Sequence, residues 1–231
     1  MINYHPSIEI LTDYAAGSLH LVHSLSVSTH LEHCHECKQQ IRKLEMIGSH
    51  LFDQVKTESR QLGNLKDSFF KNLDEQPVQK NVDTNPNQEK RNNQWGGYNI
   101  PSSLRQFITK GYDDLTWLRL SPSFKIAMLY SEEGGAQISL TRVKAGAHMP
   151  THTHTGDEIT LVLEGAFSDE SGVYRQGDFI NRDVSHKHKP VVTKDAECIC
   201  LTVLDAPIEF TGWFTRILNP IIRRYHPHSH V

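Results

Sequence analysis

The chain has 231 residues, a formal net charge of -3 and 37% hydrophobic residues. This length allows one large domain or two small ones, and the weakly acidic charge argues against a direct nucleic-acid-binding surface. No apolar run approaches the ~20 residues of a membrane helix, so we expect no association with a membrane.

Histidine and cysteine usage makes metal the first function to test. The chain holds 15 histidines, a common type of metal ligand, and four cysteines in two close pairs. Its first residues, MINYHPSIEI, lack both the basic and the apolar region of a secretory signal. We therefore expect a cytoplasmic location, where paired cysteines bind metals more often than they form disulfides.

Residues 1 to about 75 show helical periodicity. Apolar residues at helical spacing before Gly17 predict a first helix, with Pro6 in its first turn. Ser18 is a plausible cap for a second helix, and a further stripe predicts a third from about Cys37 to Val55. A shorter fourth helix is indicated by Leu65, Phe69, Phe70 and Leu73. Because such helices are unstable alone in water, we expect a small bundle with a common core.

His30, Cys34 and Cys37 form an H-x3-C-x2-C motif within this helical region. On one continuous helix the three would share a face; if the helix breaks near His33, the two cysteines still lie together where the next helix begins. Either geometry offers three of the four ligands of a closed zinc site, because thiolate sulfur suits zinc. We predict His5 as the fourth ligand, since it would hold the first helix against the next two.

Other assignments of this region stay open. His33 is the main competitor for His30, because it also stands four residues before a cysteine. The weaker candidate ligands are His20, His23 and His35. In the non-functional interpretation, the cysteines are small buried hydrophobic residues or free thiols.

A polar segment at 76–94, with prolines and many asparagines, cannot form a core and is interpreted as a linker. The alternative is an irregular surface loop within one domain. We predict a helical domain over residues 1–80, a linker over 81–97 and a second domain over 98–220.

Beyond Gly97 the chain has the character of β structure. Short apolar or alternating runs predict strands at 116–120, 125–130, 137–143, 158–163, 178–181 and 197–204. Their spacing is typical of sandwiches and barrels. A terminal helix over 211–225, interrupted at Pro220, is also predicted. The expected fold class is therefore α+β, with a small all-α bundle followed by an all-β barrel.

His152, His154 and Glu158 predict a second metal site. The histidines lie two apart, so an extended strand would place both on one face. Gly156 and Asp157 offer a turn, and a hairpin there would bring Glu158 across from His154. Two imidazoles and a carboxylate on a rigid sheet make a mixed nitrogen and oxygen site. The alternative is a histidine-rich surface turn that binds nothing.

The spacing of Gly146-x5-His152-x-His154-x3-Glu158-x6-Gly165 fits, at every position, the first motif of the cupin superfamily. The resemblance implies a double-stranded β-helix, or jelly-roll, barrel with a metal held inside by these three side chains. The second cupin motif would start at Gly177, and the resemblance then places the fourth ligand on His188. This segment departs from the family at Asp183, Ser185 and Val192, so His186 competes with His188.

Three imidazoles and one carboxylate accept several ions, so we expect zinc or another divalent transition metal in the barrel. An open coordination position would suit catalysis, whereas four protein ligands suit a structural or sensing site. Cys198 and Cys200 lie on one face of a predicted strand. They are either packed core residues or face the metal cavity, where they could be oxidised.

The whole chain resembles one family of regulators. His5 with the H-x3-C-x2-C motif, flanked by LTDYAAGSL and THLEHCHEC, looks like the zinc-binding anti-sigma domain. Followed by a linker and a cupin, the order is similar to that of the ChrR-type anti-sigma factors. The resemblance implies that the helical half sequesters an extracytoplasmic-function sigma factor. It also implies that the cupin senses singlet-oxygen or organic-peroxide stress.

Two other functions compete with this hypothesis. One is a cupin metalloenzyme, a dioxygenase or isomerase, carrying a helical zinc module for oligomerisation. The other is a scaffold in which both metals are purely structural. The family resemblance favours a protein that is not an enzyme, so we assign no catalytic residue. A homodimer through the cupin is a further possibility.

Overall fold

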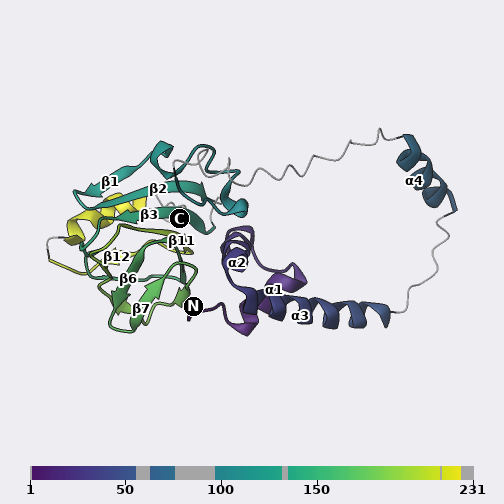
Figure 1. Ribbon diagram of the computed structural model, residues 1–231, viewed down its shortest axis with the longest axis horizontal. Helices are drawn as coiled ribbons and strands as arrows, with labels where there is room; N and C mark the ends of the chain where they lie inside the picture. The colour runs from purple at the N-terminus through teal and green to yellow at the C-terminus, as the bar shows by residue number, and fades with distance from the viewer. Residues whose placement is uncertain (1, 56–62, 76–96, 132–134, 214, 225–231) are drawn as a thin grey trace.

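The computed structural model describes residues 2–55, 63–75, 97–131, 135–213 and 215–224. A helical N-terminal region is followed by an antiparallel β barrel, which confirms the α+β class (Figure 1). Apart from Gly97, the predicted linker at 81–97 lies outside the described residues. The proposed domain boundaries therefore stay predictions.

The N-terminal region holds the four predicted helices: α1 (Ile8–Ala16), α2 (Leu21–His33), α3 (His35–Asp53) and α4 (Gly63–Glu75). The hydroxyl of Ser7 caps α1 by accepting from the Ile10 amide. Gly17 ends α1 with a φ of 69°, a conformation that glycine adopts without strain. Pro6 therefore lies ahead of the cap, and its predicted place in the first turn is wrong.

The predicted starts of the next two helices are also corrected. The hydroxyl of Ser18 donates to the Asp13 carbonyl and closes the end of α1, so it does not cap α2. Instead, α2 follows His20, whose side chain makes no cap hydrogen bond. The start of α3 lies two residues earlier than predicted, because Cys34 is its N-cap and accepts from the Cys37 amide through Sγ.

Three antiparallel sheets form the barrel. The largest contains, in spatial order, β1 (Leu118–Ser121), β2 (Phe124–Ser131), β3 (Gln137–Val143), β11 (Cys198–Leu204), β5 (Glu158–Glu164) and β8 (Phe179–Arg182). The second contains β10 (Val191–Val192), β6 (Ala166–Asp169) and β7 (Gly172–Arg175). The third contains β12 (Glu209–Phe210), β4 (His152–Thr153) and β9 (Lys187–His188). All six predicted strands belong to the largest sheet.

Short helical turns flank the barrel: η2 (Ser102–Leu104) and η3 (Tyr112–Asp114) precede it, and η4 (Thr215–Leu218) and α6 (Asn219–Arg224) follow it. The predicted start of the terminal helix at residue 211 is therefore wrong, because the helical segment begins with η4 at Thr215. Pro220 does not interrupt α6 but lies in its first turn, where its missing amide hydrogen is not needed.

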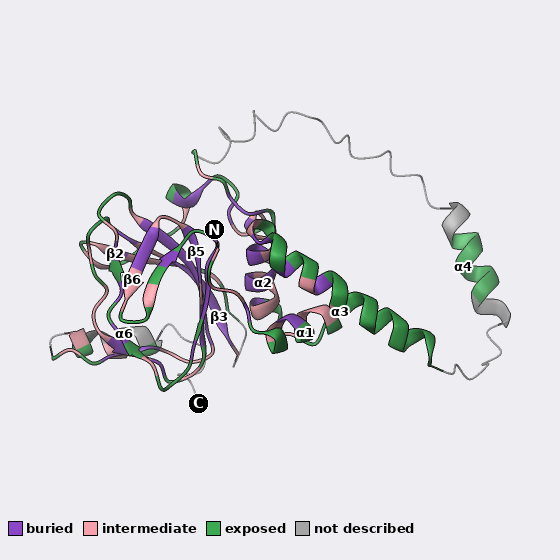
Figure 2. Ribbon diagram, turned by 60° about the horizontal axis from the view of Figure 1, so that its bottom comes forward, coloured by how far each residue is buried: buried purple, intermediate pink, exposed green. Residues whose placement is uncertain are grey.

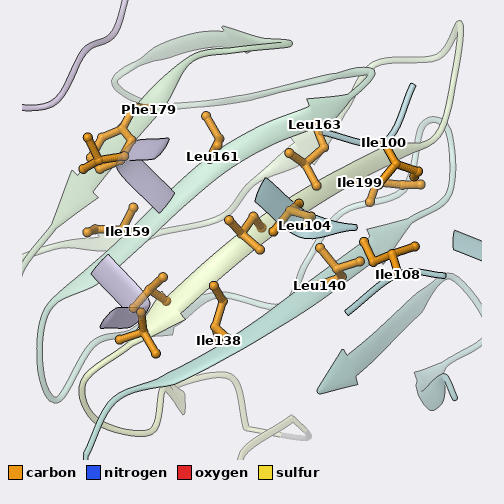
Figure 3. Packing of buried hydrophobic residues seen from close by; sticks show 14 of the residues in the cluster. Ile100, Leu104, Ile108, Ile138, Leu140, Ile159, Leu161, Leu163, Phe179 and Ile199 are labelled. Atoms are coloured by element: carbon orange, nitrogen blue, oxygen red, sulfur yellow. The ribbon is translucent and has the colours of Figure 1, made fainter. Parts of the chain in front are cut away.

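The two faces of the large sheet serve different purposes. Along β3, Ile138 and Leu140 face the helices, whereas Ser139 between them lines the barrel interior. The helix-facing side forms one buried core with α1, α2 and α3. Figure 3 shows residues of the sheet in this core, among them Ile138, Leu140 and Leu161. In this core α2 packs directly on β5 and β11.

The predicted common core exists, but α1, α2 and α3 form it together with the large sheet, and not as a bundle of four helices. Leu11, Val22 and Ile41 of α1, α2 and α3 are buried in the core that continues into the sheet. In contrast, α4 lies apart from the other helices in both views (Figures 1 and 2). The helical region is thus a three-helix layer on the barrel, with a fourth helix at a distance.

Candidate metal centres

His5, His30, Cys34 and Cys37, the four predicted zinc ligands, come together in one cluster. Their ligand atoms all lie within 4.8 Å of one another. His5 Nδ1 is 3.4 Å from the sulfur atoms of both Cys34 and Cys37. His30 Nε2 is 3.3 Å from the sulfur of Cys37. Two thiolates and two imidazoles are a set that structural zinc binds tetrahedrally.

A break between α2 and α3 assembles this cluster. Cys34 has an extended backbone, with φ -106° and ψ 106°, and separates the two helices. The motif therefore takes the second of the two predicted geometries. His30 comes from the last turn of α2, while the cysteines lie at the start of α3. His5 reaches the cluster from the segment before α1, as predicted.

The spacing and chemistry of the cluster fit a zinc ion. With Zn–N near 2.0–2.1 Å and Zn–S near 2.3 Å, ligand atoms on a tetrahedron lie about 3.3–3.8 Å apart. The nitrogen–sulfur distances of 3.3–3.4 Å agree with that geometry. Burial, together with the neighbouring Cys34 thiol, raises the pKa of Cys37 to about 12. A divalent cation would supply the positive charge that this buried thiolate needs.

One turn of the barrel contacts His30 and the segment that precedes His5. His30 Nδ1 donates to the carbonyl oxygen of Gly177 at 2.8 Å. The next residue, Asp178, is fully buried and accepts from the amides of Asn3 and Tyr4 at 2.7 and 3.2 Å. The Gly177–Asp178 turn therefore contacts His30 directly and holds the two residues that precede His5.

The competing histidines lie outside the cluster found among the described residues. His33 is the last residue of α2 and is not one of the four grouped side chains. His23 lies 3.1 Å from the carboxylate of Asp205 instead. Neither His20 nor His35 joins the cluster.

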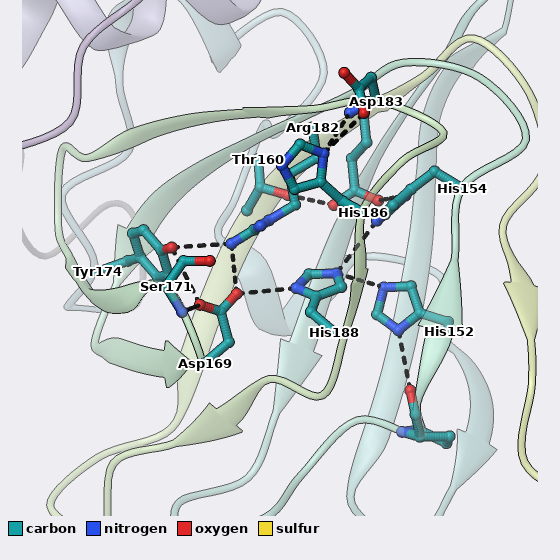
Figure 4. Close-up of polar contacts among 12 residues, drawn as sticks. His152, His154, Thr160, Asp169, Ser171, Tyr174, Arg182, Asp183, His186 and His188 are labelled. Carbon is teal, nitrogen blue, oxygen red and sulfur yellow. Dashed lines mark hydrogen bonds and ion pairs between the residues drawn. The ribbon is translucent and has the colours of Figure 1, made fainter.

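A second cluster consists of three buried imidazoles inside the barrel (Figure 4). Nε2 of His188 lies 2.9 Å from Nε2 of His152 and 3.3 Å from Nε2 of His154. Imidazoles on one tetrahedral zinc ion have nitrogens about 3.3 Å apart. Burial lowers the pKa of His152 to about 4, so this ring is neutral and keeps a lone pair for an ion.

An oxygen atom lies beside the outer nitrogen of each ring. The Nδ1 atoms of His152, His188 and His154 are 2.9–3.0 Å from oxygens of Pro150, Asp169 and Glu158, respectively. An oxygen acceptor at Nδ1 favours the tautomer whose Nε2 lone pair points to the centre. The Nδ1 hydrogen bonds of His152 and His188 therefore leave Nε2 of these two rings free to bind a metal, and His154 Nε2 lies beside them.

The predicted hairpin between His154 and Glu158 is not formed. β4 pairs with β9, which places His152 opposite His188, and its other neighbour is β12. β5 pairs with β11 and β8 in the large sheet. His154 still reaches Glu158, because residues 154–157 connect one sheet to the other.

Glu158 lies beside the three-histidine cluster and is not one of its grouped residues. Burial alone would raise its pKa, but His154, His152 and the Thr160 hydroxyl lower the pKa to about 2, so the carboxylate is ionised. Its Oε2 is 3.0 Å from His154 Nδ1, without the alignment of a hydrogen bond. Its role as a metal ligand stays a prediction.

The residue that orients His188, Asp169, was missed by sequence reasoning. Its carboxylate is 3.0 Å from His188 Nδ1 and 2.5 Å from a guanidinium nitrogen of Arg182 (Figure 4). Only the turn character of the DESG segment marks this position in the sequence. His186, the competitor of His188, points to the exposed Asp183 at 2.9 Å instead.

A cavity of about 400 Å³ lies inside the barrel, beside the three histidines. His152, His188 and Glu158 line it, and so do Cys198 and Cys200. The two cysteine sulfurs are 3.5 Å apart. The two cysteines are thus packed in the core and also face the cavity. Both positions considered from the sequence therefore apply at once.

Comparison with known proteins places the chain in a family. Residues 105–206 match the family described as the ChrR Cupin-like domain. The chain is also 33% identical over 223 residues to the Anti-sigma-E factor ChrR of Cereibacter sphaeroides, covering 96% of this chain and 99% of the relative. The chain belongs to the ChrR family of anti-sigma factors.

A solved structure supports the same assignment. The crystal structure of Rhodobacter sphaeroides SigE in complex with the anti-sigma ChrR contains a chain 32% identical to this one, with a TM-score of 0.73. The match covers 89% of this chain and 100% of that one. The predicted ChrR resemblance and cupin fold are therefore confirmed. In the described part of this ChrR-family chain, no helix has the length and apolar character needed to cross a bilayer.

Proposed function

We propose that this chain is a cytoplasmic anti-sigma factor that sequesters an extracytoplasmic-function sigma factor through its N-terminal zinc domain. The proposal extends to this chain the partner named in the structure of its relative, SigE. It is carried by similarity along nearly the whole chain, together with the complete cluster of two cysteines and two histidines. Four free cysteines agree with a reducing compartment.

Exposed apolar side chains support a docking surface for the sigma factor. They lie on the C-terminal half of α3, just after it and on α4: Met46, Ile47, Leu51, Phe52, Val55, Phe69 and Phe70 (Figure 2). Phe52 keeps 75% of its surface exposed. Apolar patches on helices commonly bind grooves of a partner protein. We assign both groups of exposed residues, those at the end of α3 and those on the separate helix α4, to sigma-factor binding.

The zinc site would set the direction of α3 and of the exposed apolar residues at its end. Cys34 caps α3, and Cys37 lies in its first turn, so an ion bound there fixes the start of the helix. His5 and His30 connect the same ion to the other helices. Metal binding at such a site adds directly to folding stability. Zinc is the proposed ion here, and zinc or another divalent transition metal is proposed in the barrel.

We further assign the sensing of singlet-oxygen or organic-peroxide stress to the barrel. Its support is the position of Cys198 and Cys200, whose sulfurs share one cavity with the histidine cluster. Oxidation or ligand binding there releases the sigma factor only if its free energy differs between the bound and free states. The Gly177–Asp178 turn offers the physical connection, because it contacts the zinc cluster and leads into β8.

The cavity also favours a second candidate function, a cupin metalloenzyme such as a dioxygenase or isomerase. That function requires an open metal position and turnover of a small substrate. A barrel metal with four protein ligands and no room for a substrate would count against it. The homodimer through the cupin stays a prediction.

The sigma-binding proposal is tested with the full chain and candidate sigma factors from its own genome. Transcription by the sigma-loaded polymerase should be inhibited by the natural chain and by Cys198→Ser, but not by Cys34→Ser. Cys198→Ser is the matched control, because it removes a buried thiol outside the zinc cluster. A folded, zinc-loaded chain that inhibits none of these sigma factors would refute the proposal.

A further inference from the structure

The wall of the barrel cavity changes from polar to apolar along β3. Gln137 and Ser139 line the cavity at the start of this strand. At its end, Val143 lines the cavity between its two strand partners, Phe124 and Cys198. A free cysteine packs like a small hydrophobic residue, so this end is apolar although it carries a thiol. The four residues of extended strand from Ser139 to Val143 span about 13 Å.

The cavity is open to solvent where the chain enters the large sheet. Thr116, Leu118 and Met128 line the cavity, and all three residues are also exposed. Leu118 keeps 40% of its surface exposed and Met128 keeps 43%. Met128 pairs with Ser139, so the opening lies beside the polar part of the wall. A small molecule can therefore enter the folded barrel.

Two buried oxygen atoms in the polar part have no hydrogen-bond partner among the described residues. They are Oε1 of Gln137, which is 4% exposed, and Oγ of Ser139, which is fully buried. An amide oxygen can only accept a hydrogen bond, and a hydroxyl oxygen can accept one as well as donate. Buried polar groups almost always have a partner, which is often a ligand or an ordered water. The group that satisfies this part of the cavity must therefore be a hydrogen-bond donor.

The side chains around the cavity favour a neutral occupant. Among the described residues that line it, Glu158 is the only acidic one, and no lysine or arginine is present. An anionic ligand would therefore lie near a carboxylate without a basic side chain to pair with. Glu158 already accepts from the Thr160 hydroxyl at 2.6 Å and lies 3.0 Å from Nδ1 of His154, so it is not a free partner for a cation either. Burial of an unpaired charge is costly, whereas a neutral molecule needs no counterion.

We infer that this cavity binds a neutral hydrophobic molecule with a hydroxyl head, of the class of medium-chain alcohols. The hydroxyl donates to the unpartnered oxygens of Gln137 and Ser139, and the hydrocarbon chain extends toward Phe124 and Val143. The cavity volume of about 400 Å³ lies within the range of small-molecule sites. The inference uses neither the barrel metal nor sigma-factor binding, and it adds a ligand class to the function proposed above.

The test is calorimetric titration of the full chain with octanol, butanol and heptyl methyl ether. The ether is an isomer of octanol whose oxygen accepts but cannot donate, so it should bind at least about fivefold more weakly. Each buried methylene raises affinity roughly fourfold, so butanol should bind at least about 50-fold more weakly than octanol. Equal affinity for octanol and the ether, or for octanol and butanol, would overturn the inference. Tighter binding of octanoate or octylammonium than of octanol would overturn the assignment of a neutral ligand.

Variants locate the two parts of the ligand. Gln137→Met combined with Ser139→Ala removes both acceptors, so octanol should lose its advantage over the ether while the ether still binds. An unchanged ratio of the two affinities would contradict the assignment of the hydroxyl. Val192→Phe fills part of the apolar wall and should remove the preference for octanol over butanol, and butanol binding then shows that the barrel is intact. Val191→Phe is the matched control, because Val191 is 41% exposed on the same strand. Sigma-factor inhibition by the same samples without ligand reports separately on the anti-sigma proposal.

Discussion

At the residue scale, the Cys37 thiol determines how the zinc cluster responds to pH. Burial and the Cys34 thiol raise its pKa to about 12, so it is protonated at neutral pH before an ion binds. Because zinc binds the thiolate, binding must release this proton. We expect at least one proton released per zinc ion and a zinc affinity that rises with pH. Calorimetry in buffers of different ionisation enthalpy measures this, and release of no proton would contradict the assignment of Cys37 as a ligand.

Asp169 offers a second test at this scale. Asp169→Asn removes the carboxylate that faces His188 Nδ1 and Arg182. Loss of such an orienting partner typically lowers metal affinity about 10–100-fold, and we expect that decrease in the barrel. The zinc cluster should be unaffected. Asp183→Asn is the matched control, because its carboxylate contacts the exposed His186 outside the cluster. Equal barrel metal affinity in both variants would argue against an orienting role for Asp169.

The sequence predicted the residues that form the clusters better than the residues that orient them. Cys34, Cys37 and His30 lie close together in the chain, and their fixed spacing is a chemical signal. The contact of His30 with Gly177 joins residues 147 positions apart and leaves no trace in composition or periodicity. Asp169 was missed for the same reason, since its partner His188 lies on another strand.

At the scale of elements, the exposed end of α3 should contribute to partner binding and not to stability. Phe52→Ser removes a large side chain that is 75% exposed, so the free energy of unfolding should change by no more than about 0.5 kcal/mol. Loss of an aromatic anchor should weaken sigma-factor binding by at least about 2 kcal/mol. Val184→Ser, an exposed apolar residue on the barrel, is the control. An unchanged sigma affinity in Phe52→Ser would exclude this part of α3 from the interface.

The Gly177–Asp178 turn is the element that attaches the N-terminal segment to the barrel. Asp178→Ala leaves the amides of Asn3, Tyr4 and Arg175 without their acceptor. Each hydrogen bond to a charged carboxylate contributes about 1.5–3 kcal/mol, so we expect a loss of at least about 2 kcal/mol of unfolding free energy. Thermal or denaturant unfolding measures this loss. Asp195→Ala, at an exposed position, should be close to neutral, and a similarly neutral Asp178→Ala would rule out the attachment.

Long elements were predicted well because their apolar residues repeat at a clear period. The helices and the six strands of the large sheet all follow such patterns. Four strands of the two small sheets, β4, β9, β10 and β12, have only two residues each, too few for alternation to be recognised. The hairpin at His154 failed because sequence proximity suggested one sheet, whereas β4 and β5 belong to two. Ser18 was misassigned because a serine can also close the preceding helix.

At the scale of the whole molecule, the two clusters of candidate metal ligands lie on opposite sides of one sheet and are connected by one turn and strand. The Gly177–Asp178 turn contacts His30, and β8 then leads to Arg182, which contacts Asp169 beside His188. A rearrangement at the barrel cluster can therefore reach the zinc cluster through bonded and hydrogen-bonded neighbours. This arrangement was not predictable, because periodicity describes each half separately and not how α2 packs on β5 and β11.

The central claim is that a zinc-held helical layer presents the surface that captures a sigma factor. Native mass spectrometry of the full chain mixed with its sigma factor reports metal content and complex formation in one spectrum. We expect two ions per natural chain and a one-to-one complex. Cys34→Ser should carry one ion fewer and form no complex. A Cys34→Ser chain that has lost the ion yet binds the sigma factor fully would contradict the claim.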